Sequence, residues 1–371
     1  MLTKASLVLF ASTLFAAATV PACASRVALE DRPCPCADGW TCCASRNVCV
    51  APGTACPSSE AGAAPDAAPE AGEAAVVQLA RGQSARCLAF DSEHVYWQNA
   101  NGLVVGAPKA RPDFKVSSFQ TPLANNARCG LAIDGASLYT TSFQYGKIIR
   151  LSTVSNGEWA IGGEGSIFGA LSGPSSVLVD PQWIWVTEYE GGRVSKIAKS
   201  GPTDAVVVAT GMSRPDAIVG DADHVYWINR GTPAGGDGSA PSDGAIMRLA
   251  KSGGEPVALA SNLPTPNGLA LHGGRLFWTD ADGRVSSIGV GGEGQTTLAT
   301  REIAPGPIAA DAASVYWGTS DLRSVARGGG PVVTAFDTNL PVTLALDDTR
   351  VYWASTDEVW SALKTSALAK R

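Results

Sequence analysis

A seven-residue motif recurs between residues 91 and 353, and it limits the folds open to this chain more than any other feature. Each copy begins with a turn residue, usually aspartate, and most copies end with an aliphatic residue followed by aromatic side chains. The copies read DSEHVYW, DGASLYT, DPQWIWV, DADHVYW, HGGRLFW, DAASVYW and DDTRVYW, and they end at positions 97, 140, 186, 227, 278, 317 and 353. Repeats of about 40–45 residues that contain several short strands are typical of β-propeller blades. The spacing therefore predicts an all-β fold, a seven-bladed β-propeller over residues 76–371.

The adjacent aromatic residues of the motif predict strands that are buried on both faces. Tyr226 and Trp227 follow each other in the chain, so on a strand their side chains point to opposite faces of the sheet. A blade that packs between two neighbours buries both faces, which explains why neither position is polar. We expect the aspartate that opens the motif to close the turn between first and second strands, because its carboxylate accepts hydrogen bonds from nearby backbone amides.

The last copy of the motif predicts how the ring closes. After Trp353, the segment DEVWSALK supplies a third strand for blade seven, and no pattern for a fourth strand follows it. We expect the missing outer strand to come from AVVQLA, residues 75–80, ahead of blade one. This pairing would place both ends of the propeller in one blade and leave no free sheet edge.

The first 22 residues are typical of an export signal peptide, because Lys4 precedes an uncharged apolar run from Ala5 to Val20. The run ends in VPAC, which resembles a bacterial lipobox. The resemblance implies lipidation of Cys23, membrane attachment by that lipid alone, and, with Ala24 next to it, anchoring in the outer membrane. Ordinary signal-peptidase cleavage after ACA, residues 22–24, is the alternative. Both interpretations predict an exported protein of the bacterial periplasm or cell surface.

Residues 23–56 are expected to form a small disulfide-rich module that carries the lipid. Besides Cys23, it holds six of the chain's nine cysteines, at positions 34, 36, 42, 43, 49 and 56. A segment this short needs cross-links because it cannot bury a core, and its lack of histidine favours three disulfides over a zinc site. The piece CADGWTCC resembles the start of granulin-type cysteine knots. Residues 57–75, rich in alanine, proline and acidic residues, are expected to form a disordered linker.

The two remaining cysteines, Cys87 and Cys129, occupy matching places in ARCLAFD and ARCGLAID, where the first strands of blades one and two begin. Neighbouring blades approach most closely at the central channel, and an exported protein favours paired thiols. We therefore predict a disulfide between them, and two buried free thiols are the alternative.

The segment GLALHGGRLFWTDADGRV, residues 269–286, resembles the YWTD repeats of lipoprotein-receptor propellers and, more loosely, NHL repeats. The resemblance implies a propeller that binds partners, although it does not identify a ligand. The pieces RPDAIVGD and TPNGLALH resemble gluconolactonase-type propellers, which implies that Asp216 and Asn267 help to hold a divalent metal. That family also uses a glutamate near the first blade, where this chain has Cys87. The alternative is that both residues only shape turns and that no cofactor is needed.

Residues at two kinds of loop are expected to surround the mouth of the central channel. Those entering the first strands are Cys87, Cys129, Ser175, Ser176, Asp216, Asn267, Gly306 and Val342. From the hairpins between second and third strands we predict a ligand-binding mouth formed by Glu188, Glu190, Arg230, Asp280, Asp282, Asp321 and Asp357. Arg230 is the one base among these hairpin residues, so a cationic partner is expected, unless the acids only serve turn geometry. The insertion at residues 230–244 is expected to lie over the mouth as a recognition loop.

Two functions fit these observations. The first is a non-catalytic binding or scaffold module of the cell envelope, whose partner is a protein, peptide or glycan. The alternative is a metal-dependent hydrolase or lactonase that acts at the mouth. A lyase of the streptogramin type, which shares the propeller, would need a histidine at the mouth, but His94, His224 and His272 are all expected on the opposite face. The net charge of −6 without a basic stripe argues against nucleic acid as a partner.

Overall fold

The computed structural model describes residues 41–43, 48–50, 76–109, 117–121, 128–155, 158–200, 204–233 and 242–364. The chain divides into two units, Met1–Gly72 and Glu73–Arg371. In the first, β1 (Thr41–Cys43) pairs antiparallel with β2 (Val48–Val50), so that Cys42 lies opposite Cys49. The predicted signal peptide, Cys23 and the linker at residues 57–75 lie outside the described residues. None of the described segments is a helix long and apolar enough to cross a membrane.

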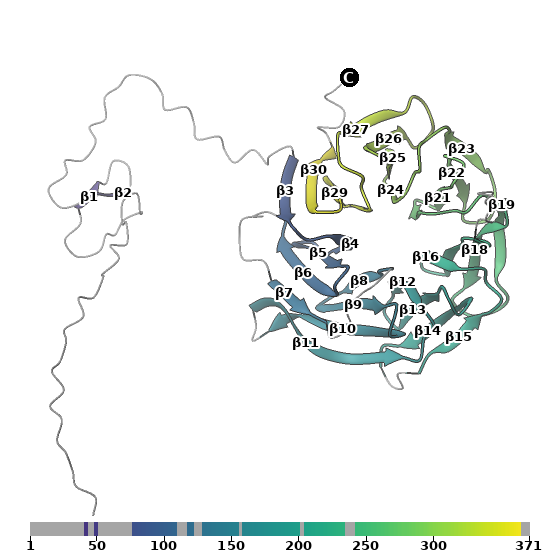
Figure 1. Ribbon diagram of the computed structural model, residues 1–371, viewed down its shortest axis with the longest axis horizontal. Helices are drawn as coiled ribbons and strands as arrows, with labels where there is room; N and C mark the ends of the chain where they lie inside the picture. Colours follow the sequence, from purple (N-terminus) through teal and green to yellow (C-terminus); the bar gives the residue numbers. More distant parts are fainter. Residues whose placement is uncertain are drawn as a thin grey trace, which may run out of the picture. The chain divides into compact units, whose positions relative to one another are not determined.

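The second unit consists of seven four-stranded antiparallel sheets arranged in a ring (Figure 1). The strands of each blade are given from the innermost outward. Blade one is β4 (Ala85–Phe90), β5 (His94–Asn99), β6 (Leu103–Pro108) and β7 (Ser117–Gln120), and blade two is β8 (Leu131–Asp134), β9 (Ser137–Ser142), β10 (Lys147–Ser155) and β11 (Glu158–Gly169). Blade three is β12 (Pro174–Val179), β13 (Trp183–Glu188), β14 (Arg193–Ala198) and β15 (Val206–Ala209). Blades four and five are β16 (Pro215–Gly220), β17 (His224–Asn229), β18 (Gly244–Ala250) and β19 (Val257–Leu263); and β20 (Leu269–His272), β21 (Arg275–Thr279), β22 (Val285–Gly289) and β23 (Thr296–Ala299).

Blade six is β24 (Ile308–Ala310), β25 (Ser314–Gly318), β26 (Leu322–Ala326) and β27 (Val333–Phe336); blade seven is β28 (Thr343–Leu346), β29 (Arg350–Ala354), β30 (Glu358–Leu363) and β3 (Val76–Arg81). The all-β, seven-bladed propeller predicted from the repeat is confirmed. The predicted closure is also confirmed, because β3 precedes blade one in the chain and pairs with β30. Leu79 of β3 is 4% exposed and packs with Trp97 and Val359 in the core between blades seven and one.

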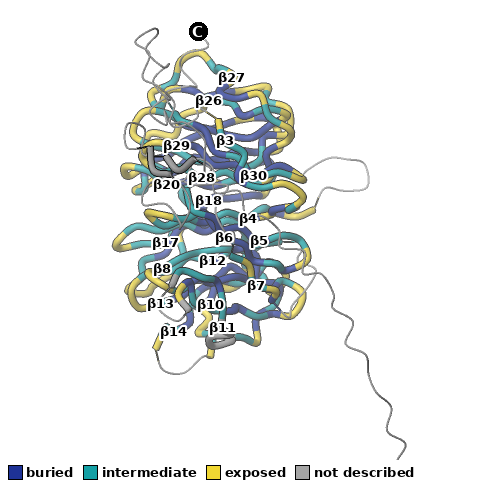
Figure 2. Tube along the Cα trace, turned by 90° about the vertical axis from the view of Figure 1, so that its left-hand side faces the viewer, coloured by how far each residue is buried: buried dark blue, intermediate teal, exposed yellow. Residues whose placement is uncertain are grey.

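The core lies between blades, as the paired aromatic residues predict. Trp227 packs with Trp185 of blade three, whereas Tyr226 packs with Trp278 of blade five. Both residues of the pair are fully buried, and Figure 2 shows buried segments in the interior of the propeller and exposed turns at its edges. The two faces of β17 therefore belong to two different inter-blade cores.

The aspartate of the motif closes the first hairpin of a blade, as predicted. Asp221 Oδ1 accepts hydrogen bonds from the amides of Asp223 and His224, at 2.9 and 2.8 Å. The structure adds a contact that the sequence pattern did not predict, because the Tyr226 hydroxyl donates to Asp221 Oδ2 at 2.7 Å. The same three contacts recur at Asp91 and Asp347. They satisfy the polar end of a tyrosine whose ring lies in the core.

The predicted disulfide is present. Cys87 of β4 and Cys129, two residues before β8, are bonded, with their Cα atoms 5.7 Å apart. The bond joins the inner strand of blade one to the loop that enters blade two, across 42 residues of sequence.

Candidate ligand-binding mouth

The loops that enter the inner strands enclose a cavity of about 300 Å³ at one end of the channel. Its walls come from blades two to seven and include Cys129, Ser175, Ser176, Asp216, Asn267, Gly306 and Val342. The structure thus brings together all the predicted entry residues except Cys87. These positions converge because each begins the innermost strand of its blade, where neighbouring blades lie closest.

Asp216 and Asn267, which both line this cavity, are linked by an arginine. Arg230 Nη1 donates to Asn267 Oδ1 at 2.6 Å and lies 3.4 Å from Asp216 Oδ2. Arg128, from the loop before β8, forms a second ion pair with the same Asp216 oxygen. The carboxylate therefore bridges two guanidinium groups that reach it from blades two and four.

A tyrosine holds two arginines beside this network. The guanidinium carbon of Arg128 lies 3.7 Å from the centroid of the Tyr189 ring, and Arg214 Nη1 donates to the Tyr189 hydroxyl at 3.3 Å. Arg214 also donates to the carbonyls of Gly231 and Thr232. Arg214 adopts a φ of +52° immediately before Pro215, a left-handed conformation that costs free energy in a non-glycine residue. These contacts fix the entry loop of blade four and the start of the insertion.

Arg128, Arg214 and Tyr189 were not among the predicted site residues. Arg128 precedes Cys129 and Arg214 precedes Pro215, so both occupy loop positions that the sequence already assigned to the mouth. The sequence does not show which way an arginine side chain points, and Tyr189 reads as an ordinary hairpin residue. The only signal in the sequence was that Arg128 and Arg214 come just before the inner strands of their blades.

Burial governs ionisation in this network. It raises the pKa of the Asp216 carboxyl, and the two guanidinium groups oppose that shift. Burial also lowers the pKa of Arg230; Asp216 opposes this effect, while Arg128 and Arg214 add to it by charge repulsion. Arg230 therefore contacts one carboxylate, Asp216, and lies near two further guanidinium groups.

The predicted metal site at Asp216 and Asn267 stays a prediction. Hard divalent cations usually take six or more oxygen ligands, and a cation would compete with Arg230 for both residues and with Arg128 for Asp216. Within the described part of the chain, no three His, Cys, Asp or Glu side chains gather as a metal site would require.

The acids predicted to line the mouth differ in their roles. Glu188 is fully buried and binds Arg193, Ser195 and the Ser172 amide, while Asp280 accepts from the amides of Asp282 and Arg284. Glu190, Asp282 and Asp357 are exposed, and Asp321 is half-buried. Arg230 was the base expected among the hairpin residues, and the structure adds Arg128 and Arg214, which reach the same network from the entry loops. The acidic character of the hairpins therefore does not extend to the centre of the mouth.

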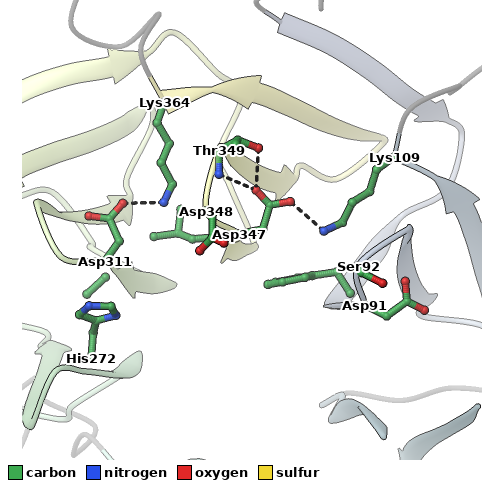
Figure 3. A pocket seen from close by; sticks show the side chains of 12 residues that line it. Asp91, Ser92, Lys109, His272, Asp311, Asp347, Asp348, Thr349 and Lys364 are labelled. Carbon is green, nitrogen blue, oxygen red and sulfur yellow. Dashed lines mark hydrogen bonds and ion pairs between the residues drawn. The ribbon is translucent and has the colours of Figure 1, made fainter. Parts of the chain in front are cut away.

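The opposite end of the channel holds a second cavity, of about 580 Å³, lined by first-hairpin residues (Figure 3). Its lysines already have partners: Lys109 Nζ lies 2.7 Å from Asp347 Oδ2, and Lys364 Nζ lies 2.7 Å from Asp311 Oδ2. His272 lines this cavity at the position that other blades fill with aspartate. His94 and His224 begin β5 and β17 at the same end of their blades, so all three histidines lie away from the mouth, as predicted.

The central part of the insertion, residues 234–241, lies outside the described residues, so its predicted position over the mouth is not tested. Its described ends are joined, because Asp243 accepts hydrogen bonds from the amide and hydroxyl of Thr232.

No family model and no curated protein matches this chain. Among solved structures it is similar to a streptogramin B lyase, with a TM-score of 0.62, 15% identity, and coverage of 77% of this chain and 96% of that chain. It is also similar to virginiamycin B lyase from Staphylococcus aureus, with a TM-score of 0.61, 16% identity, and coverage of 77% and 98%. A third is Kuenenia stuttgartiensis hydrazine synthase, with a TM-score of 0.59, 14% identity, and coverage of 74% and 93%. At such identities the likeness shows the propeller fold alone.

Proposed function

We propose that this chain is an exported protein of the bacterial cell envelope whose propeller binds a partner at the mouth without catalysing a reaction. One observation carries the proposal. The cavity at the mouth is built from six blades, and the charged residue in its lining, Asp216, is paired with Arg128 and Arg230. General acid–base catalysis needs a group free to exchange a proton with the substrate. A network of mutually paired side chains is better suited to recognition.

The location rests on the N-terminal sequence and on the disulfide. The lipobox-like VPAC implies an anchor on Cys23, and the export signal implies passage out of the cytoplasm. The bond between Cys87 and Cys129 fits an oxidising compartment such as the periplasm or the cell surface. We infer an outer-membrane lipoprotein whose partner is another envelope component, such as a protein, peptide or glycan.

Photo-crosslinking in the envelope tests this proposal. Leu340, 62% exposed in the loop that enters blade seven, is replaced by p-benzoylphenylalanine in the full chain. The matched control is the same replacement at Val257, 48% exposed at the outer start of β19. We expect an adduct of defined mass from position 340 and none from position 257. Adducts from neither position, or the same adducts from both, would contradict a binding face at the mouth.

The metal-dependent hydrolase remains the second candidate, because Asp216 and Asn267 do share one cavity. Calorimetric titration of the full chain with Ca²⁺, Mn²⁺ and Zn²⁺ separates the two functions. If the binding proposal holds, the chain should show no saturable metal binding that depends on Asp216. Saturable metal binding that the Asp216→Ala variant loses would favour the hydrolase.

A further inference from the structure

We infer that the mouth binds its ligand through an oxyanion, a carboxylate or phosphate group, held by Arg128 and Arg230 (this rests on the proposed binding function). Asp216 is the internal anion that keeps the two arginines in place when no ligand is present.

Both arginines have donor groups to spare. Within the described residues, Arg128 and Arg230 each donate hydrogen bonds through Nη1 alone, Arg128 to Asp216 and Arg230 to Asp216 and Asn267. A guanidinium carries five N–H donors in a rigid fork that matches carboxylate and phosphate oxygens. The two side chains are 27% and 18% exposed, so their remaining donors are accessible from solvent.

The arginines are also held in place before any ligand arrives. Arg128 stacks on the Tyr189 ring, and Tyr189 is itself fixed by the hydrogen bond from Arg214. Donors that are already ordered lose less conformational entropy on binding, which strengthens recognition.

The charge balance around Asp216 favours an additional anion. Arg128, Arg214 and Arg230 face one another around a single directly bound carboxylate. Asp243 interacts electrostatically with Arg214, but within the described residues no acid other than Asp216 forms an ion pair with Arg128 or Arg230. Glu188 pairs with Arg193, Asp243 accepts from Thr232, and the exposed Glu190 lies beside Gly173. A bound oxyanion would add negative charge beside Arg230, whose guanidinium is repelled by Arg128 and Arg214.

The loop that enters blade seven adds two exposed apolar side chains to the mouth. Val342 lines the cavity and is 37% exposed, and Leu340, two residues earlier, is 62% exposed. A ligand that joins an apolar body to an oxyanion would contact both this loop and the arginines.

Four probes that share a benzene ring test this inference by calorimetry on the full chain. Benzoate and phenyl phosphate carry the two oxyanions, benzamide is neutral, and benzamidine is a cation. We expect saturable binding of benzoate, phenyl phosphate or both, and none of benzamide or benzamidine, up to about 10 mM, the range of weak single-group affinities. Binding of one oxyanion but not the other shows whether the mouth recognises a carboxylate or a phosphate group.

Two variants should change oxyanion affinity in opposite directions. Arg128→Gln removes a charge-assisted donor and should weaken binding at least about tenfold, whereas Asp216→Asn removes the competing anion and should strengthen it several-fold. Arg284→Gln, in the exposed pair with Asp282, is the control and should leave affinity unchanged. Arg128→Lys, which keeps the charge, serves if the Gln variant unfolds, and it should weaken binding less.

Binding of benzamidine alone, binding of none of the probes, or weaker oxyanion binding by a folded Asp216→Asn variant would overturn the inference. The crosslinking at Leu340 does not depend on the arginines. A positive crosslink without oxyanion binding would therefore reject this inference and keep the proposed function.

Discussion

Lys109, which follows the third strand of blade one, contacts Asp347 of blade seven, with Nζ 2.7 Å from Oδ2, although the two residues are 238 positions apart. The same relation recurs elsewhere in the ring, where the lysine after a third strand contacts the motif aspartate of the preceding blade. The other pairs are Lys199 with Asp134, Lys251 with Asp180 and Lys364 with Asp311. The charges on this face therefore pair across blade boundaries.

Lys109→Met should destabilise the propeller by roughly 1–2 kcal/mol, between the values for exposed and buried ion pairs. The side chains of Lys109 and Asp347 are 13% and 18% exposed, and Lys109 Nζ also lies 4.5 Å from the Phe90 ring centroid. Urea unfolding at pH 7 measures the loss. Arg284→Met, in a pair whose partners are about half exposed, should cost less than about 0.5 kcal/mol. Equal losses in both variants would contradict a special role for the inter-blade pair.

The contribution of this pair should disappear in acid. Burial raises the pKa of Asp347, but hydrogen bonds from Lys109, Tyr352 and two backbone amides outweigh it and hold the pKa below its ordinary value. A carboxyl with a lowered folded-state pKa stabilises fully above its unfolded pKa of about 3.9 and loses that contribution as pH falls further. The difference between wild type and Lys109→Met should therefore be constant from pH 5 to 7 and shrink below about pH 4. A difference that grows in acid would refute the assignment.

Replacing Cys87 and Cys129 together by alanine should lower the free energy of unfolding by about 4 kcal/mol, because the bond closes a loop of 42 residues in the unfolded chain. Urea unfolding of the double variant measures this change. Peptide mapping of the unreduced protein should recover the two cysteines in one linked peptide. Recovery of each with a free thiol would contradict the bond.

Leu79→Ala should destabilise the ring by about 2–4 kcal/mol, the usual cost of a leucine removed from a packed core. Leu79 belongs to the strand that closes blade seven and is 4% exposed, whereas Val76 in the same strand is 45% exposed. Val76→Ala is the control and should cost less than about 0.5 kcal/mol. Thermal unfolding of both variants compares them, and a small effect at Leu79 would mean that β3 contributes little to closure.

Asp221→Ala should cost about 1–2 kcal/mol, because two backbone amides and the Tyr226 hydroxyl lose their acceptor. Asp223→Ala, in the same exposed turn, removes a side chain that accepts none of these hydrogen bonds and should be nearly neutral. Denaturant unfolding distinguishes the two. Similar losses of stability in the two variants would show that the turn depends on its total negative charge rather than on the hydrogen bonds of Asp221.

Blade number and ring closure were predictable because both follow from counting. Each motif marks one second strand, and residues 75–80 supply the outer strand that blade seven lacks. The Cys87–Cys129 bond was predictable for the same reason, since equivalent places in neighbouring blades meet at the channel. The arginine network was not, because Arg128 and Asp216 belong to blades that are not adjacent in the ring. Their contact depends on side chains that cross the mouth.

The sequence by itself determined the architecture of this protein, because a repeated pattern of turn residue and paired aromatics requires blades buried on both faces. It also predicted export, which stays a prediction, and identified the loops that form the mouth. Only the tertiary structure decided the charge at that mouth. Glu188 and Asp280 are turned into their own hairpins, while Arg128 and Arg230 converge on Asp216 from different blades. Local sequence patterns fix the backbone conformation of each blade. The electrostatic field at the mouth depends on which charged side chains come into contact, and the closure of the ring decides those contacts.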